Sequence, residues 1–214
     1  WVFDLDNTLY PPIYRLFDQI EVKMTAYVMD TLGVDRARAD YLRDHYWRTY
    51  GTTLSGMMAE HDVDPGPYLV DVHDIDLSHV PPDLLLRGHI RTLPGRKVVY
   101  TNGSEFHADR VLAARGLTGI FDAIYGIEHA NFRPKPHADA YEAILKRDGF
   151  DPTGAAMFED EPRNLEVPHE LGMTTVLVGD GPAHPYIAHQ TGELTAFLSD
   201  LLAAGTPTGV WAAP

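Results

Sequence analysis

The stretch WVFDLDNTLY, residues 1–10, opens with an apolar run of strand length and ends this run with two aspartates. Asp4 and Asp6 stand two positions apart, so an extended backbone would turn both side chains to the same side. Taken alone, such a pair is more often a solvated turn or a cap than a catalytic pair. Its meaning therefore depends on what the rest of the chain places beside it.

Four further apolar runs have the length and the Val, Ile and aromatic content of strands, namely RKVVYT, DAIYGI, AAMFE and TTVLVG. Helical spacing separates most of them, and a last helix is expected near the end of the chain. The expected helices cover residues 105–115, 136–147, 164–172 and 193–204. In the first of these we expect Phe106, Val111 and Leu112 on one face. The alternation predicts an α/β fold with a Rossmann-like parallel sheet and helices on both faces, and such sheets bind ligands at the carboxyl ends of their strands.

The interval between the first two expected strands is too long for a single crossover, which needs only about a dozen residues. Residues 11–85 contain no convincing strand but several helix-like stretches, clearest at 13–32 and 37–50. We therefore expect an α-helical cap at 11–85, inserted into an α/β core formed by 1–10 and 86–205. The alternative is a helical layer that only thickens the core. Residues 206–214 are interpreted as a tail.

Composition restricts the partners and the chemistry. The 214 residues are 44% hydrophobic and 22% charged, as in ordinary globular proteins. With 31 acidic against 17 basic residues, the net charge of −14 argues against a nucleic acid polymer as partner and requires a local cation for any anionic substrate. The absence of cysteine excludes disulfides and thiolate chemistry.

Nothing in the sequence indicates a membrane or a secretory signal. No apolar run approaches the roughly 18 residues of a membrane span, so we expect a cytoplasmic protein without a membrane partner. Because the chain begins at Trp1 inside a strand-like run, we also expect the natural N-terminus to lie further upstream. The oligomeric state cannot be read from the sequence.

Later segments place more polar side chains where expected strands end. Thr101 and Asn102 follow the second run, Glu159 and Asp160 follow the fourth, and Lys135 stands between two prolines just before a helix. Each has an ordinary interpretation, as a helix cap, a solvated acidic loop or a surface lysine. Since the carboxyl ends of parallel strands share one edge of a sheet, independent coincidence is the weaker explanation.

The segments DLDNT, TN, PKP and ED occur in this order, with a long helical insertion after the first. In this they resemble the four motifs of the haloacid dehalogenase (HAD) superfamily of phosphohydrolases, and the resemblance covers nearly all of residues 1–180. Within the superfamily, DNTLYPP, HYWRTYGTTLSGM and FEDEPRNLE are similar to the pyrimidine 5′-nucleotidase branch.

The resemblance implies a hydrolase that cleaves a small phosphate monoester through an aspartyl-phosphate. Asp4 would be the nucleophile that attacks phosphorus. Asp6 would protonate the departing oxygen and later activate water. This explains the opening pair, because one carboxylate must attack while its neighbour carries a proton. Asp6 also argues against dehalogenation, since true dehalogenases are expected to lack an acid at this position.

The resemblance also implies Mg²⁺ as cofactor and a set of groups that hold the phosphate. The metal would be held by the Asp4 carboxylate, the Asp6 backbone carbonyl and Asp160, with Glu159 assisting directly or through water. Thr101, Asn102 and Lys135 would hold the phosphoryl oxygens, and Lys135 would supply the local cation. Asn164 replaces a second acidic residue that many relatives carry after the fourth motif.

The substrate implied by the branch is a pyrimidine nucleoside 5′-monophosphate. A sugar-phosphate phosphatase, a phosphomutase and a non-catalytic phosphate-binding protein remain as alternatives. The cap should select the substrate, but the candidates in its HYWR segment are equally suited to packing or to solvent, and we assign none of them: Arg43, His45, Tyr46, Trp47 and Arg48. The 11 histidines show no spacing typical of zinc ligands.

Overall fold

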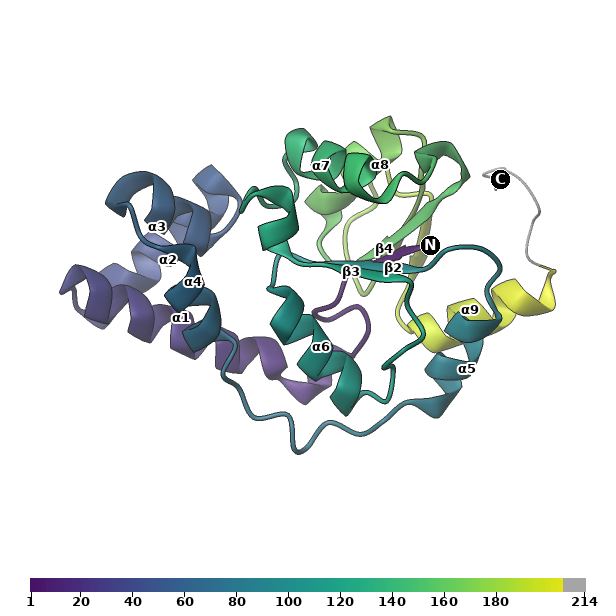
Figure 1. The fold of residues 1–214 in the computed structure, drawn as a ribbon, viewed down its shortest axis with the longest axis horizontal. Coiled ribbons are helices and arrows are strands. Elements are labelled where there is room, and N and C mark those ends of the chain that lie inside the picture. Colours follow the sequence, from purple (N-terminus) through teal and green to yellow (C-terminus); the bar gives the residue numbers. More distant parts are fainter. Residues whose placement is uncertain (206–214) are drawn as a thin grey trace.

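The computed structural model describes residues 1–205, in which a parallel sheet stands beside a group of helices (Figure 1). The predicted tail at 206–214 lies outside the described residues. Within the described part the sheet has six strands in the order β3-β2-β1-β4-β5-β6, and every neighbouring pair is parallel. The strands are β1 (Val2–Phe3), β2 (Val98–Tyr100), β3 (Ala123–Tyr125), β4 (Ala156–Glu159), β5 (Thr174–Val178) and β6 (His189–Thr191). The predicted Rossmann-like α/β fold is confirmed.

Helices cover both faces of this sheet, as predicted (Figure 1). One face carries α7 (Ala138–Asp148) and α8 (Glu166–Glu170), and the other carries α5 (Leu84–Thr92), α6 (Glu105–Ala114) and α9 (Leu194–Ala203). Alternation along β1 assigns one residue to each layer: Val2 packs in the cluster that contains Ile144 of α7, and Phe3 packs in the cluster that contains Leu198 of α9. Phe3 also stacks on Phe158 of β4, with ring centroids 4.7 Å apart.

Two details differ from the expectations. Phe106 is 62% exposed, whereas Val111 and Leu112 are buried. Positions five or six apart on a helix do not share a face, so the buried face of α6 begins instead at His107 and Ala108. The short edge strand β6 was not predicted, because its sequence, His-Gln-Thr, has no apolar run.

The first four α-helices of the chain form a separate layer at one end of the sheet (Figure 1). They are α1 (Leu16–Leu32), α2 (Arg36–Tyr50), α3 (Thr53–His61) and α4 (Pro65–Val72). Leu16 and Ile20 at the start of α1 join the main core, whereas Val28 and Tyr46 belong to a second cluster between the helices. Gly56 is required at the contact of α2 with α3, because a Cβ atom there would lie 2.2 Å from Cγ of Tyr46.

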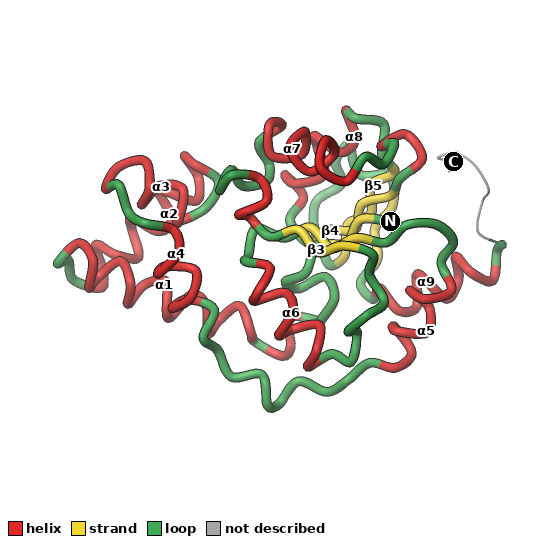
Figure 2. The backbone as a smooth tube through the Cα atoms, viewed as in Figure 1, coloured by secondary structure: helices red, strands yellow, loops and turns green. Residues whose placement is uncertain are grey.

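After α4 the chain returns to the sheet through a largely irregular segment, residues 73–83, drawn as a loop in Figure 2. It leads into α5, which packs against α9. Because the chain leaves the helical layer through this loop, we propose that residues 11–85 form a cap and that residues 1–10 and 86–205 form the core. Across residues 1–205, none of the helices combines the length and the apolar character needed to span a bilayer.

Candidate active site

The carboxyl edge of the sheet and the cap helices enclose a cavity of about 630 Å³. Strand β1 ends just before Asp4, β2 ends just before Thr101, and β4 ends at Glu159. The cavity is lined by every residue that the sequence predicted for the site, namely Asp4, Asp6, Thr101, Asn102, Lys135, Glu159 and Asp160. The topology accounts for this gathering, because β1 lies between β2 and β4 in a parallel sheet.

Lys135 is the cation at the base of this cavity. It is 1% exposed, and its Nζ donates to Asp4 Oδ1 at 2.6 Å, to Glu159 Oε1 at 2.7 Å and to the Tyr100 carbonyl at 3.0 Å. Burial disfavours the charge, but the two carboxylates outweigh burial and hold the pKa of Lys135 above its usual value. The lysine is therefore charged and holds the nucleophile predicted at Asp4 in one orientation.

The Asn102 side chain holds the backbone of Lys135. Its Oδ1 accepts from the Lys135 N–H at 2.8 Å, and its Nδ2 donates to the Lys135 carbonyl at 3.1 Å. Both ends of the amide are therefore engaged. The neighbouring Thr101 is buried, and its Oγ1 accepts from the Gly103 N–H at 2.9 Å, which leaves its own hydroxyl proton available to a ligand.

Three carboxylates meet beside the lysine, since ligand oxygens of Asp4, Glu159 and Asp160 lie within 4.8 Å of one another. Burial and the nearby carboxylates, against the pull of Lys135, raise the pKa of Asp4 to about 8. Burial, followed by Glu159 and Asp4, raises the pKa of Asp160 to about 9. One lysine therefore does not balance the group. An all-oxygen set of this kind fits a hard divalent cation such as Mg²⁺.

Glu159 differs from its two neighbours because both of its oxygens have protein partners. Oε1 accepts from Lys135 and from Asn164 Nδ2 at 2.7 Å, and Oε2 accepts from the Glu161 N–H at 2.7 Å. Asn164, where the resemblance led us to expect an acid, thus donates a hydrogen bond to Glu159. An acid at this position would add a further negative charge beside a buried carboxylate.

Asp6 is held by two residues that the sequence analysis did not identify. Its Oδ1 accepts from the Tyr10 hydroxyl at 2.7 Å and contacts His107 Nε2 at 2.9 Å. Burial alone would favour the protonated carboxyl, but His107 and the hydrogen bonds from His107 and Tyr10 outweigh burial and lower the pKa of Asp6. Without a ligand, Asp6 is therefore ionised, which suits a general base.

His107 is itself supported from the chain that leaves the cap. The ring of His73 stacks on it with centroids 4.3 Å apart and an interplanar angle of 12°, and His73 Nδ1 lies 3.1 Å from the Ser104 hydroxyl. Burial, together with the neighbouring His107, lowers the pKa of His73 to about 3, so His73 is neutral. Tyr10 lies four residues after Asp6 in the opening stretch, but no pattern in the sequence connects His73 to this site.

The cap residues considered from sequence fall into three groups. Tyr46 is buried within the cap, so the packing interpretation is confirmed for it. Arg43 and Trp47 line the cavity. His45 and Arg48 pair with acidic neighbours near the surface.

One residue of the core reaches across to this layer of helices. The guanidinium of Arg163, in the short turn Pro162–Leu165 after β4, lies over the Trp47 ring with its Cζ 3.8 Å from the centroid. It also donates to the carbonyls of Trp47 at 3.2 Å and of Gly51 at 3.0 Å. The loop that carries Asp160 is thereby joined to the end of α2.

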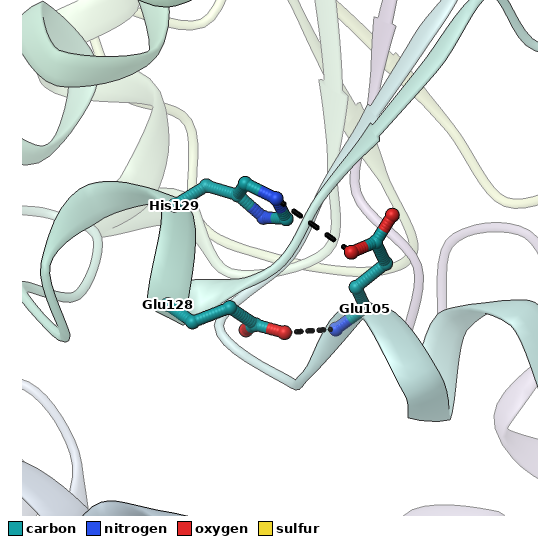
Figure 3. A group of neighbouring side chains, drawn as sticks. All are labelled: Glu105, Glu128 and His129. Carbon is teal, nitrogen blue, oxygen red and sulfur yellow. Dashed lines mark hydrogen bonds and ion pairs between the residues drawn. The ribbon is translucent and has the colours of Figure 1, made fainter.

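A second group of possible metal ligands, Glu105, Glu128 and His129, joins the segment after β3 to the start of α6 (Figure 3). Glu128 Oε1 accepts from the Glu105 N–H at 2.9 Å, and His129 Nε2 lies 3.6 Å from Glu105 Oε2. His129 Nδ1 accepts from the Gly126 N–H at 3.1 Å. These contacts join the segment after β3 to the start of α6, and we interpret the group as structural.

Comparison with known proteins agrees with this geometry. A model of the haloacid dehalogenase-like hydrolase family matches residues 96–178. Phosphate metabolism protein 8 of Saccharomyces cerevisiae is 25% identical over 194 residues, which cover 82% of this chain and 60% of the relative. The match thus spans about 60% of the length of that curated protein.

Solved structures share the fold at low sequence identity. YfnB of Bacillus subtilis, a HAD hydrolase solved with magnesium, has a TM-score of 0.60 at 15% identity and covers 96% of this chain and 97% of its own. A HAD phosphatase of Thermococcus onnurineus has a TM-score of 0.59 at 17% identity, with 94% and 96% covered. Residues 96–178 thus match the haloacid dehalogenase-like hydrolase family, the solved structures share the fold, and the order of the parallel strands and the gathered motif residues agree with this similarity.

Proposed function

We propose that this protein is a Mg²⁺-dependent phosphomonoesterase that works through an aspartyl-phosphate on Asp4. The observation that carries the proposal is the position of Asp4, in contact with the buried Lys135 and two residues from a second carboxylate in the same cavity. The match of residues 96–178 to a hydrolase family supports it. Lys135 engages Oδ1 of Asp4, so the other carboxylate oxygen is assigned the attack on phosphorus.

Asp6 is assigned both proton transfers. A phosphate dianion beside it opposes its ionisation, so Asp6 carries a proton when the substrate is bound. It donates this proton to the leaving oxygen as the phosphorus–oxygen bond breaks, and the contacts with His107 and Tyr10 stabilise the carboxylate that results. The same carboxylate then takes a proton from the water that attacks the phosphoryl group on Asp4. Oδ1 is occupied by its two partners, so Oδ2 is the oxygen assigned to these transfers.

The cofactor proposed from the oxygen ligand set is Mg²⁺. We assign it to the carboxylates of Asp4 and Asp160 and to the main-chain carbonyl of Asp6. Glu159 holds Lys135 and Asn164 and would assist the metal directly or through water. When bound, the cation offsets the repulsion between the phosphate and these carboxylates.

The phosphoryl oxygens are assigned to the residues at the end of β2 and to Lys135. Thr101 donates its hydroxyl proton to one oxygen. Asn102 contributes its main-chain N–H, and its side chain keeps Lys135 in place, since both ends of that amide are engaged there. Lys135 supplies charge stabilisation to the transferring group.

The proposed substrate is a pyrimidine nucleoside 5′-monophosphate, on the similarity of the cap segment to that branch. A cavity of about 630 Å³ lies within the range of roughly 300–1,000 Å³ usual for small-molecule sites. A phosphomutase is the second candidate, because a Thermotoga maritima protein described as a β-phosphoglucomutase shares the fold with a TM-score of 0.58 at 14% identity. A sugar-phosphate phosphatase would use the same site, and a non-catalytic role is disfavoured because every motif residue reaches the cavity.

The test is a phosphate-release screen with Mg²⁺ over UMP, CMP, AMP, ribose 5-phosphate and glucose 6-phosphate. We expect UMP or CMP to be hydrolysed fastest, and Asp4→Asn to abolish release from all of them. If a sugar phosphate leads by a wide margin, the nucleotidase assignment fails and the phosphatase assignment stands. Isomer formation without free phosphate would identify a mutase. The cytoplasmic location expected from the sequence stays a prediction.

A further inference from the structure

Two buried hydrogen-bond donors in the cap wall of the cavity have no acceptor among residues 1–205. They are the hydroxyl of Tyr68 on α4 and the Nε–H of Arg43 on α2, and both residues line the cavity. Tyr68 is 3% exposed, and the side chain of Arg43 is 16% exposed. Native proteins leave few buried polar groups unpaired, so two in the same wall require an explanation.

Both groups can offer a proton to a ligand. Burial raises the pKa of Tyr68 against the smaller opposing effects of the Arg43 charge and of a hydrogen bond with the Thr53 side chain, so its hydroxyl stays protonated. A guanidinium has donors and no acceptor. Arg43 donates from Nη1 to Thr25 Oγ1 at 2.7 Å and from Nη2 to Glu21 Oε1 at 3.1 Å. These two hydrogen bonds fix the plane of the guanidinium, and its Nε–H has no acceptor among residues 1–205.

We propose that Tyr68 and Arg43 select the substrate by donating hydrogen bonds to acceptor atoms of its leaving group. This inference rests on the proposed phosphatase function, and it concerns the part of the substrate remote from phosphorus. Carbonyl oxygens on a flat ring, as in a pyrimidine base, meet the requirement. A leaving group without acceptors would leave both donors unpaired.

The charges of the same wall restrict the leaving group further. Glu21, Asp40 and Asp44 also line the cavity from α1 and α2, and Arg43 is the cation that these two helices contribute to the lining. Each of the three carboxylates is about half exposed, at 51%, 48% and 57%. A second negative charge on the substrate would meet them on entry. The preferred leaving group is therefore uncharged and rich in acceptors.

The experiment compares Tyr68→Phe with Tyr27→Phe, using UMP and phenyl phosphate as substrates. Tyr27 is a matched control, because its ring packs edge-on against Tyr68 at 5.0 Å but the residue is not part of the cavity lining. In Tyr68→Phe we expect KM for UMP to rise roughly three- to tenfold, as for one lost hydrogen bond, with kcat unchanged. KM for phenyl phosphate, whose ring has no acceptor, should not change in either variant.

The melting temperature gives a second readout, in which Tyr68→Phe should lose nothing although it binds UMP more weakly. Removal of a buried hydroxyl whose proton has no acceptor among the described residues should leave the melting temperature of Tyr68→Phe at or above that of the wild type. Arg43→Lys keeps the charge but lacks the Nε–H, and it should raise KM for UMP in the same direction. In the wild type, orotidine 5′-monophosphate, which is UMP with an added carboxylate, should be the poorer substrate.

Equal changes for UMP and phenyl phosphate in Tyr68→Phe, or none for UMP, would overturn the inference while the phosphatase function stands. If the wild type releases phosphate from neither compound, the proposed function fails, and uridine binding then decides the inference. A rise in melting temperature with uridine that is lost in Tyr68→Phe supports it. Absence of that rise in the wild type refutes it.

Discussion

Replacing Asp6 by Asn separates the two chemical steps assigned to this enzyme. Oδ1 of Asp6 accepts from Tyr10 at 2.7 Å and from His107 at 2.9 Å, and an amide oxygen can accept both bonds. The substitution therefore preserves the local arrangement and the main-chain carbonyl while it removes the group that carries the proton. We expect the variant to fold as the wild type does.

The size of the effect follows from the role of the lost group. A positioned general acid or base typically contributes about 10²- to 10⁴-fold in rate, which corresponds to roughly 3–5 kcal/mol in activation free energy. UMP should lose at least this factor in kcat, because its ribose oxygen leaves poorly without a proton and the water step also lacks its base. The binding of UMP should change much less than its turnover.

The assay is a rapid-mixing measurement with p-nitrophenyl phosphate and with UMP. Nitrophenolate departs as a stable anion and needs little protonation, so Asp4 should still be phosphorylated at an appreciable rate. We expect a burst of nitrophenolate equal to the enzyme concentration, followed by slow turnover, and no burst of uridine from UMP. The Asp4→Asn control should show neither phase.

Near-normal steady-state turnover of UMP by Asp6→Asn would refute this reasoning. Asp6 would then not be the acid and base, and the pair at the end of β1 would need another explanation. A linear progress curve with p-nitrophenyl phosphate, slow from the first turnover, would instead show that Asp6 is needed before the leaving group departs.

Three further predictions concern the metal, the junction with the cap and the packing of the cap. Exhaustive chelation should abolish phosphate release and added Mg²⁺ should restore it; full turnover after chelation would contradict the assigned cofactor. Arg163→Ala removes the guanidinium over Trp47 and both carbonyl contacts, so KM for UMP should rise several-fold, with Arg163→Lys in between; an unchanged KM would show that the junction plays no part in binding. Gly56→Ala places a Cβ 2.2 Å from Cγ of Tyr46 and should cost about 1–3 kcal/mol in the free energy of unfolding, measured by urea denaturation, whereas Gly88→Ala in α5, where a Cβ meets nothing within 4 Å, should be neutral or stabilising.

The residues predicted at the sheet edge could be found from sequence because parallel strands share one polarity. Once the apolar runs before Asp4, Thr101 and Glu159 are taken as parallel strands, their ends must meet at a single edge. Lys135, which stands between two prolines, reaches the same edge of the sheet and contacts Asp4 there. This part of the site follows from strand order and needs no knowledge of side-chain packing.

The support of Asp6 and the cap wall could not be found in this way. His73 reaches His107 only because the chain leaving α4 passes over the start of α6, and that course depends on how the cap packs. Tyr68 and Arg43 lie on different helices and meet at the cavity through helix packing alone. The error at Phe106 has a different cause, because residues five or six positions before Val111 and Leu112 lie on another face of the helix, and Phe106 is exposed.

In the proposed reaction a phosphoryl group passes through Asp4. The most direct measurement is to mix Asp6→Asn with p-nitrophenyl phosphate and Mg²⁺, quench in acid, reduce the acyl phosphate with borohydride, and locate the modified residue by peptide mass spectrometry. We predict modification at Asp4 that approaches one group per enzyme and is absent from Asp4→Asn. Turnover without a phosphoryl group on Asp4, or with the group on another residue, would contradict the account.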